Sequence, residues 1–142
     1  LSDVVVLKVV ENLVGDKSPQ VRRECAIALR HTKTDQAAKL WAELASRHDG
    51  EDRWYLEALG LSSDLNADAC FSAWLAKVGD KWNTSAGRDI IWRVRSKAAP
   101  SYLAKILKDK KTPTESHPRY VRALDFHSGP EKDKALEALL DI

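Results

Sequence analysis

The sequence predicts an all-α protein, a solenoid of about four and a half helix-pair repeats that spans residues 1–142 as a single domain. Three observations predict it. Apolar residues recur with the period of an α-helix, the helical segments recur about every 30 residues, and capping residues stand at the segment boundaries. In such an array, each helix pair covers its apolar face only by stacking on its neighbours.

One helix of each pair is marked by apolar residues at positions i, i+3, i+4 and i+7. In the opening segment these residues are Val6, Val9, Val10 and Leu13. Four further segments follow, the last of them shorter. One member of each stripe forms a series with spacings of 31, 34, 28 and 33 residues: Val10, Trp41, Leu75, Leu103 and Leu136.

A second set of apolar pairs lies between these stripes and marks the other helix of each pair. Its anchor residues are spaced 30, 35 and 30 residues apart, so two independent series share one period. We therefore expect paired helices along the whole chain. The pairs are Ala26/Leu29, Leu56/Leu59, Ile91/Val94 and Val121/Leu124.

The expected helix boundaries follow from capping residues and from proline. Ser18, Thr34 and Thr84 precede helical segments, where a side-chain oxygen can accept a free backbone N–H. Prolines at the first helical position mark three starts. Residues 4–6 (VVV) alone could form a strand, but the longer helical period favours a helix. The expected helices span residues 3–14, 18–31, 35–47, 52–62, 67–79, 85–96, 99–109, 118–127 and 130–141.

The first of these helices lacks a partner, so we expect the chain to be part of a longer multidomain protein. The composition is that of a globular protein, with 44% hydrophobic and 31% charged residues. The net charge of +2 gives no strong attraction to nucleic acid or to an anionic membrane. No apolar run approaches the roughly 20 residues that span a bilayer, so we expect no membrane insertion.

The sequence contains no recognisable catalytic or metal-binding motif. Cys25 and Cys70 stand far apart among helix-forming residues and are expected to be small buried hydrophobes, although a disulfide between them stays open. The four histidines form no HxxxH or HExxH pattern, and no GxGxxG, Walker A or GxSxG string occurs. We therefore expect no catalytic residue, no metal site and no cofactor in this segment.

Five tryptophans supply the candidate binding residues. Trp41 and Trp74 lie on apolar stripes and are expected in the core. The others are less well placed by periodicity, and exposed tryptophan and arginine dominate binding surfaces. The alternative is tryptophan packed between repeats, with arginines stacked on it or solvated. The candidate docking residues are Lys81, Trp82, Arg88, Trp92, Arg93 and Arg95.

Residues 16–26 (DKSPQVRRECA) resemble the start of a HEAT repeat. This resemblance implies a right-handed α–α superhelix of HEAT or armadillo type. In that family, an arginine commonly bonds the loop aspartate, so Arg22 would brace the turn between helices through Asp16. The later repeats keep an arginine near the helix start, but their proline pattern is degraded.

A closer resemblance covers residues 12–135. Residues 52–60 (DRWYLEALG), 79–83 (GDKWN) and 122–130 (RALDFHSGP) are similar to the HEAT region of planctomycete-type haem-binding proteins, which are described as membrane-bound dehydrogenases. In that family a β-propeller precedes this region and a CxxCH cytochrome c domain follows it. The resemblance implies an extracytoplasmic bacterial module that carries no redox chemistry of its own.

Three functions are compatible with the sequence. The first is a non-catalytic scaffold that docks other proteins or domains on its extended surface. The second is a HEAT-like DNA-binding protein of the alkylpurine DNA glycosylase kind. Such a protein needs phosphate-binding cations on one face, whereas acids here nearly match the cations, so nucleic acid is not the expected partner. The third is the positioning of redox partners next to a haem domain.

Overall fold

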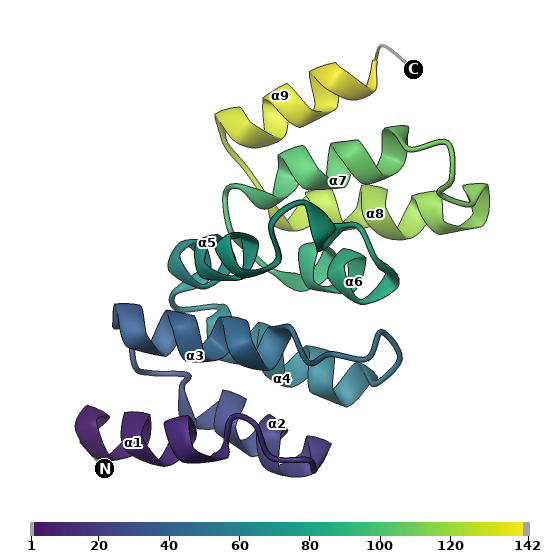
Figure 1. Cartoon of the computed structure of the whole chain (residues 1–142). Coiled ribbons are helices and arrows are strands. Elements are labelled where there is room, and N and C mark those ends of the chain that lie inside the picture. The colour runs from purple at the N-terminus through teal and green to yellow at the C-terminus, as the bar shows by residue number, and fades with distance from the viewer. Residues whose placement is uncertain (1, 141–142) are drawn as a thin grey trace.

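The computed structural model describes residues 2–140, and these residues form helices without any β-strand. The predicted all-α fold is therefore confirmed for this part of the chain (Figure 1). Short 3-10 turns follow α5 and flank α8. The α-helices are α1 (Asp3–Leu13), α2 (Pro19–Ala28), α3 (Asp35–Ala45), α4 (Arg53–Ser63), α5 (Ala67–Val78), α6 (Ser85–Arg93), α7 (Ala99–Lys108), α8 (His117–Ala123) and α9 (Pro130–Leu139).

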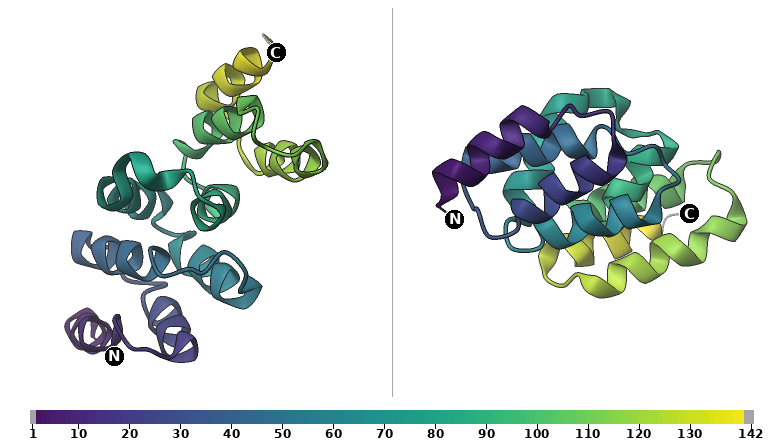
Figure 2. Two further views of the ribbon diagram at one scale, coloured as in Figure 1. Left: turned by 45° about the vertical axis from the view of Figure 1, so that its right-hand side comes forward. Right: turned by 90° about the horizontal axis from the view of Figure 1, so that it is seen from below.

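The helices form two layers that run side by side along the array (Figure 2, left). The first layer holds α1, α3, α5, α7 and α9, and the second layer holds α2, α4, α6 and α8. Within the second layer, each helix packs against the next one in order. The buried apolar residues lie between the layers from α1 to α9. The helices therefore follow one another in serial order along the core.

Side-chain caps fix the helix starts that the sequence predicts. The hydroxyls of Ser18, Thr34 and Thr84 each accept the backbone N–H three residues further on, at 3.3, 3.1 and 2.9 Å. The carboxylate of Asp52 accepts two backbone N–H groups at the start of α4. Each cap satisfies an amide that the helix itself leaves free.

The helix ends differ from the prediction where tertiary contacts intervene. The segment expected to be helical to residue 96 ends at Arg93, and Val94 is extended. The reason is Asp68 on α5, whose Oδ1 accepts from Ser96 Oγ at 2.9 Å and from the backbone N–H of Lys97 at 3.0 Å. The chain leaves the helix to reach this carboxylate. The last predicted helix extends to residue 141, which lies outside the described residues.

Two tryptophans anchor the core as the stripes predict. Trp41 and Trp74 are each 2% exposed. The indole Nε1 of Trp41, on α3, donates to the backbone oxygen of Leu59, on α4, at 2.9 Å. In the opposite direction, the Tyr55 hydroxyl of α4 donates to the backbone oxygen of Leu44 on α3 at 2.6 Å. These two bonds join the layers of one helix pair in both directions.

The first layer is joined across its middle by aromatic rings. The ring of Tyr102, on α7, packs edge-on against Phe71 of α5 and against Trp82, with centroids 5.6 and 5.2 Å apart. Trp82 lies in the 3-10 turn after α5, so this turn fills the space between α5 and α7.

Some apolar residues of the predicted stripes are not buried. Val9 and Val121 are each 50% exposed and Leu136 is 42% exposed. In α9 the buried position is Ala135, one residue before the predicted anchor Leu136. Val9 and Leu136 belong to α1 and α9, which lie at the ends of the array, and Val121 lies on an exposed face of α8. The helical period identifies a buried face only where another helix covers it.

Trp41→Phe tests the connection between the layers. The variant loses the hydrogen bond to Leu59 and part of the ring volume, so we expect the free energy of unfolding to fall by about 1–3 kcal/mol. Urea denaturation followed by circular dichroism measures it. Trp54→Phe is the matched control because Trp54 is 66% exposed, and it should stay within about 0.5 kcal/mol of the wild type. Equal effects of the two substitutions would contradict the role given to Trp41.

Candidate functional site

The side chain of Arg93 joins α6 to α4 within the second layer. Its Nε donates to Glu57 Oε1 at 3.1 Å, and its two terminal nitrogens donate to the two oxygens of Asp64 at 3.0 and 3.1 Å. Arg93 is 8% exposed. Burial alone would lower the Arg93 pKa. The hydrogen bonds and the negative charges of Asp64 and Glu57 outweigh burial, so the Arg93 pKa is raised. This bidentate arrangement fixes the distance and the rotation between the two helices.

Gly60 makes this contact possible. The Arg93 side chain passes close to Gly60 of α4, where it reaches Glu57 and Asp64. A Cβ atom at Gly60 would lie 2.2 Å from Arg93 Nε and 2.3 Å from Arg93 Cζ. No other residue type leaves room for the guanidinium at this position, so the glycine is needed for its small size.

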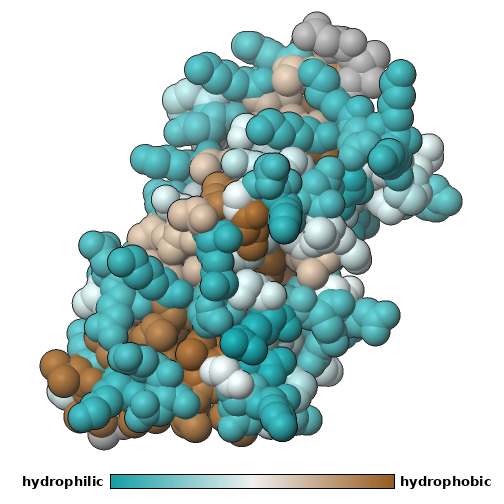
Figure 3. All heavy atoms as spheres, viewed as in Figure 1, coloured by the Kyte–Doolittle hydropathy of each residue, from teal (hydrophilic) through white to brown (hydrophobic). Residues whose placement is uncertain are grey.

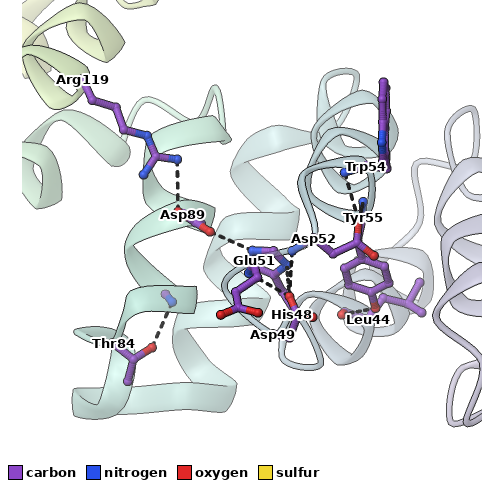
Figure 4. Close-up of polar contacts among 11 residues, drawn as sticks. Leu44, His48, Asp49, Glu51, Asp52, Trp54, Tyr55, Thr84, Asp89 and Arg119 are labelled. Carbon is purple, nitrogen blue, oxygen red and sulfur yellow. Dashed lines mark hydrogen bonds and ion pairs between the residues drawn. The ribbon is translucent and has the colours of Figure 1, made fainter. Parts of the chain in front are cut away.

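Asp89 on α6 makes a second set of bridges, which Figure 4 shows. One carboxylate oxygen lies 2.9 Å from His48 Nε2, and the other lies 3.1 Å from an Arg119 nitrogen. His48 belongs to the loop between α3 and α4, and Arg119 belongs to α8. The imidazole of His48 stacks on the ring of Tyr55, with an angle of 9° between the two ring planes. One buried carboxylate thus ties three successive pairs together.

Arg88 connects α6 to the loop that precedes α8. Its guanidinium donates to Asp109 Oδ2 at 2.9 Å, to Thr112 Oγ1 at 2.8 Å and to Asn83 Oδ1 at 2.7 Å. Asp109 also accepts the backbone N–H of Lys111 and the side-chain amide of Asn83, and these two bonds, with the charge of Arg88, lower the Asp109 pKa. The surrounding hollow of about 590 Å³ is polar, and its arginines already bind carboxylates within the chain.

A groove runs across the second layer beside the Arg93 contact. We call it the second-layer groove, and it consists of two adjoining hollows of about 550 and 580 Å³ that share Glu57. The first hollow has Ile27, Trp54 and Leu61 on its walls, with Arg23 and Glu24 at the rim. The second hollow is lined by Asp64, Trp92, Arg93, Arg95 and Phe126.

Each of the two hollows has an exposed aromatic side chain in its lining. Trp54 on α4 and Phe126 after α8 are each 66% exposed, and Ile27 and Leu61 are each 39% exposed. Isolated apolar side chains on a surface are ordinary, but a contiguous group beside a hollow is typical of a binding surface. The groove therefore offers apolar contact area on a layer whose helices are locked in register.

Arg95 also lies in this groove, and no carboxylate among residues 2–140 forms an ion pair with it. Its guanidinium carbon is 3.9 Å from the centroid of the Phe126 ring, and its Nη1 donates to the backbone oxygen of Trp92 at 3.1 Å. Burial and the neighbouring charge of Arg93 lower the Arg95 pKa. His127, which follows Phe126, also has a lowered pKa. Burial is the larger cause, and the positive charge of Arg95 is the second.

The six candidate docking residues are distributed over three places. Trp92, Arg93 and Arg95 meet in the second-layer groove. Arg88 lies in the polar hollow, where Asp109 binds it. Lys81 is exposed, and Trp82 packs against Tyr102 rather than facing a partner.

Arg22 and Asp16 contact each other through a backbone atom. Arg22 Nη1 donates to the carbonyl oxygen of Asp16 at 2.7 Å. The Asp16 carboxylate instead accepts the backbone N–H of Ser18 at 2.8 Å, at the start of α2. Both bonds stabilise the turn between α1 and α2.

Trp54 and Phe126 belong to the groove, although the sequence analysis did not select them. A signal for Trp54 is present in the sequence. Trp54, Glu57 and Leu61 follow one another at i, i+3 and i+7, on the face of α4 opposite to the buried stripe. A tryptophan and a leucine on the face expected to meet water indicate a contact surface. Phe126 has no such signal, because it lies in a turn.

No group of three or more metal-binding side chains occurs among residues 2–140. Cys25 and Cys70 are both buried and unpaired, and burial raises the pKa of the Cys70 thiol to about 12. Within the described residues, no helix combines the length and the apolar character needed to cross a bilayer.

Comparison with family models, curated proteins and solved structures finds no match to this chain.

Gly60→Ala tests the Arg93 contact. The added methyl group displaces the guanidinium from Glu57 and Asp64, so we expect the free energy of unfolding to fall by about 2–3 kcal/mol, although alanine favours a helix. The control is Gly15→Ala, whose Cβ would meet only Arg47 Nη2 at 3.6 Å, an ordinary contact. Urea denaturation compares the two variants, and a Gly60→Ala protein as stable as the wild type would rule out the steric argument.

His127→Gln tests the burial of the imidazole. Because the folded state lowers the His127 pKa below its ordinary value of 6.5, the unfolded chain binds the proton more readily. Stability from this residue is complete above pH 6.5 and falls as the pH drops toward the folded pKa. The wild type should therefore lose more stability than the variant between pH 7.5 and pH 5. Parallel pH curves for the two proteins would contradict this prediction.

Proposed function

We propose that the chain is a HEAT-like α-solenoid, a right-handed superhelix that acts as a non-catalytic scaffold and docks protein segments in its second-layer groove. The serial packing of paired helices supports the solenoid assignment. The groove supports docking, because it is formed by helices from four successive pairs and therefore suits an elongated partner segment.

The observation that carries the proposal is the exposure of Trp54 and Phe126. Each ring leaves 66% of its surface open to water, beside hollows in the same layer. Leaving such rings exposed costs solubility, and burying an aromatic ring against a partner contributes strongly to binding. An apolar side chain of a partner would fill the hollow next to Trp54.

The contacts beneath the groove support the same function. Arg93 and Asp89 hold α4, α6 and α8 at fixed positions before any partner arrives. A surface that is formed in advance loses little conformational entropy on binding. We infer that the groove binds without rearrangement of the helices.

Protein is a better candidate partner than nucleic acid for this surface. DNA binding requires cations that are free to bind phosphates. Arg88, Arg93 and Arg119 are each bound to a carboxylate of the chain. A phosphate would have to displace these partners, whereas the apolar walls of the groove suit an apolar side chain.

Within a longer protein, such a module would hold neighbouring domains in a fixed arrangement. The resemblance to haem-binding multidomain proteins suggests a propeller dehydrogenase-like domain on one side and a cytochrome c domain on the other. The module itself would supply position and no chemistry.

Selection of random peptides on the immobilised protein tests the proposal. We expect enriched peptides to contain large apolar side chains and to compete with one another. Their affinity should fall about tenfold or more for Trp54→Ser and for Phe126→Ser. Both side chains are exposed, so both variants should fold, as circular dichroism would verify.

The control for this selection is Val4→Ser, which removes a 75% exposed apolar side chain on α1. It should leave peptide binding unchanged. Peptides that bind the Trp54→Ser and Phe126→Ser proteins as tightly as the wild type would overturn the assignment of the groove.

A further inference from the structure

A second groove lies in the first layer, between α7 and α9. We call it the α7–α9 groove, and its volume is about 330 Å³. Its floor consists of small side chains from both helices: Ala98, Ser101, Ala104, Ala135 and Ala138. The two helices pack directly against each other beneath this floor. A floor without large side chains lets a further helix approach closely, since helices pack 8–10 Å apart depending on the residues between them.

Lysines surround this apolar floor. Lys97, Lys105 and Lys108 line the groove on the α7 side and Lys134 lines it on the α9 side, while Glu131 is the single acidic residue at the rim. In the upper part of Figure 3, over α7 and α9, hydrophilic side chains flank a strip of paler and tan atoms. The groove therefore combines an apolar base with a strongly positive border.

These four lysines form no ion pair with any residue of the described chain. The second layer behaves differently, because Arg88, Arg93 and Arg119 there each bind a carboxylate. All four lysines are exposed. The Lys105 ammonium lies 4.6 Å from the centroid of the Tyr102 ring, a contact that leaves its charge without a carboxylate. Their mutual repulsion is relieved when anions bind among them.

The arrangement of the lysines matches the length of a helix. Lys97 stands just before α7, and the helix, which ends at Lys108, is about 15 Å long. Ser101, Lys105 and Lys108 follow one another on one face of α7. A helix that lies along the groove would meet three lysines on the α7 side and Lys134 on the α9 side.

We propose that the α7–α9 groove binds an acidic amphipathic helix of a partner protein or domain. The apolar stripe of that helix rests on the alanine floor, and its carboxylates meet the lysines on either side. The two grooves share no lining residue and belong to different layers. This inference therefore stands independently of the second-layer groove, and the two sites together would let the module hold two partners at once.

A designed peptide tests the proposal. The probe is a helical peptide with leucine along one stripe and glutamate on both sides of it, labelled for fluorescence anisotropy. A matched peptide with glutamine in place of glutamate is the first control. We expect the acidic peptide to bind at low salt, to bind about tenfold more weakly at high salt, and to exceed the glutamine peptide in affinity.

Paired charge reversals locate the site. Lys105→Glu combined with Lys134→Glu should weaken the acidic peptide at least tenfold. Lys8→Glu combined with Lys39→Glu changes the net charge equally on exposed positions of α1 and α3, and should leave the affinity within about twofold. Ser101→Trp fills the groove without any change of charge and should also abolish binding. Circular dichroism verifies that each variant folds.

Several outcomes would overturn the proposal. Equal binding of polyglutamate, which lacks a leucine stripe, would show that the lysines attract anions in general. Equal loss in the Lys8/Lys39 control would show that net charge alone decides the affinity. Binding that survives Ser101→Trp would place the peptide elsewhere, and the absence of binding at low salt would remove the site. None of these results would affect peptide selection on the second-layer groove.

Discussion

The structure depends on bridges between successive helix pairs, and the bidentate contact of Arg93 with α4 is the most demanding of them. A serial array has no central core, so every junction between pairs has to fix its own geometry. Apolar packing supplies much of the binding energy at such a junction but tolerates sliding. The Arg93 guanidinium permits only one arrangement, because it must reach Glu57 and Asp64 together across a glycine. Asp89 repeats the principle on the next junction by binding Arg119.

Much of the fold could be predicted from the sequence, because helix starts and apolar periods are local properties. Ser18, Thr34 and Thr84 cap helices as expected since a cap needs only its own helix. The misses have nonlocal causes. Val94 leaves the helix because Ser96 and Lys97 bind Asp68 of α5, which lies 28 and 29 residues before them in the chain. Val121 and Leu136 are exposed because no helix covers their side of the array.

The candidate site was harder to predict for the same reason. Residue type pointed to Trp92, Arg93 and Arg95, which do meet in one groove. It could not tell which arginine serves the fold and which serves a surface. That distinction depends on the final contacts. Arg93 binds the carboxylates of Glu57 and Asp64, whereas Arg95, within the described part of the chain, contacts the ring of Phe126 and a backbone oxygen.

The distribution of paired and unpaired cations has a physical consequence for how the array could work. Arginine dominates where helices must be held together, because its planar group binds two acceptors at fixed angles. Lysine dominates around the α7–α9 groove, where a flexible ammonium group can follow a partner's carboxylate without a fixed geometry. Internal rigidity and external adaptability are thus assigned to different residue types. Because the junctions are rigid, two partners bound in different layers would be held at a constant separation, which is the property that a scaffold between domains requires.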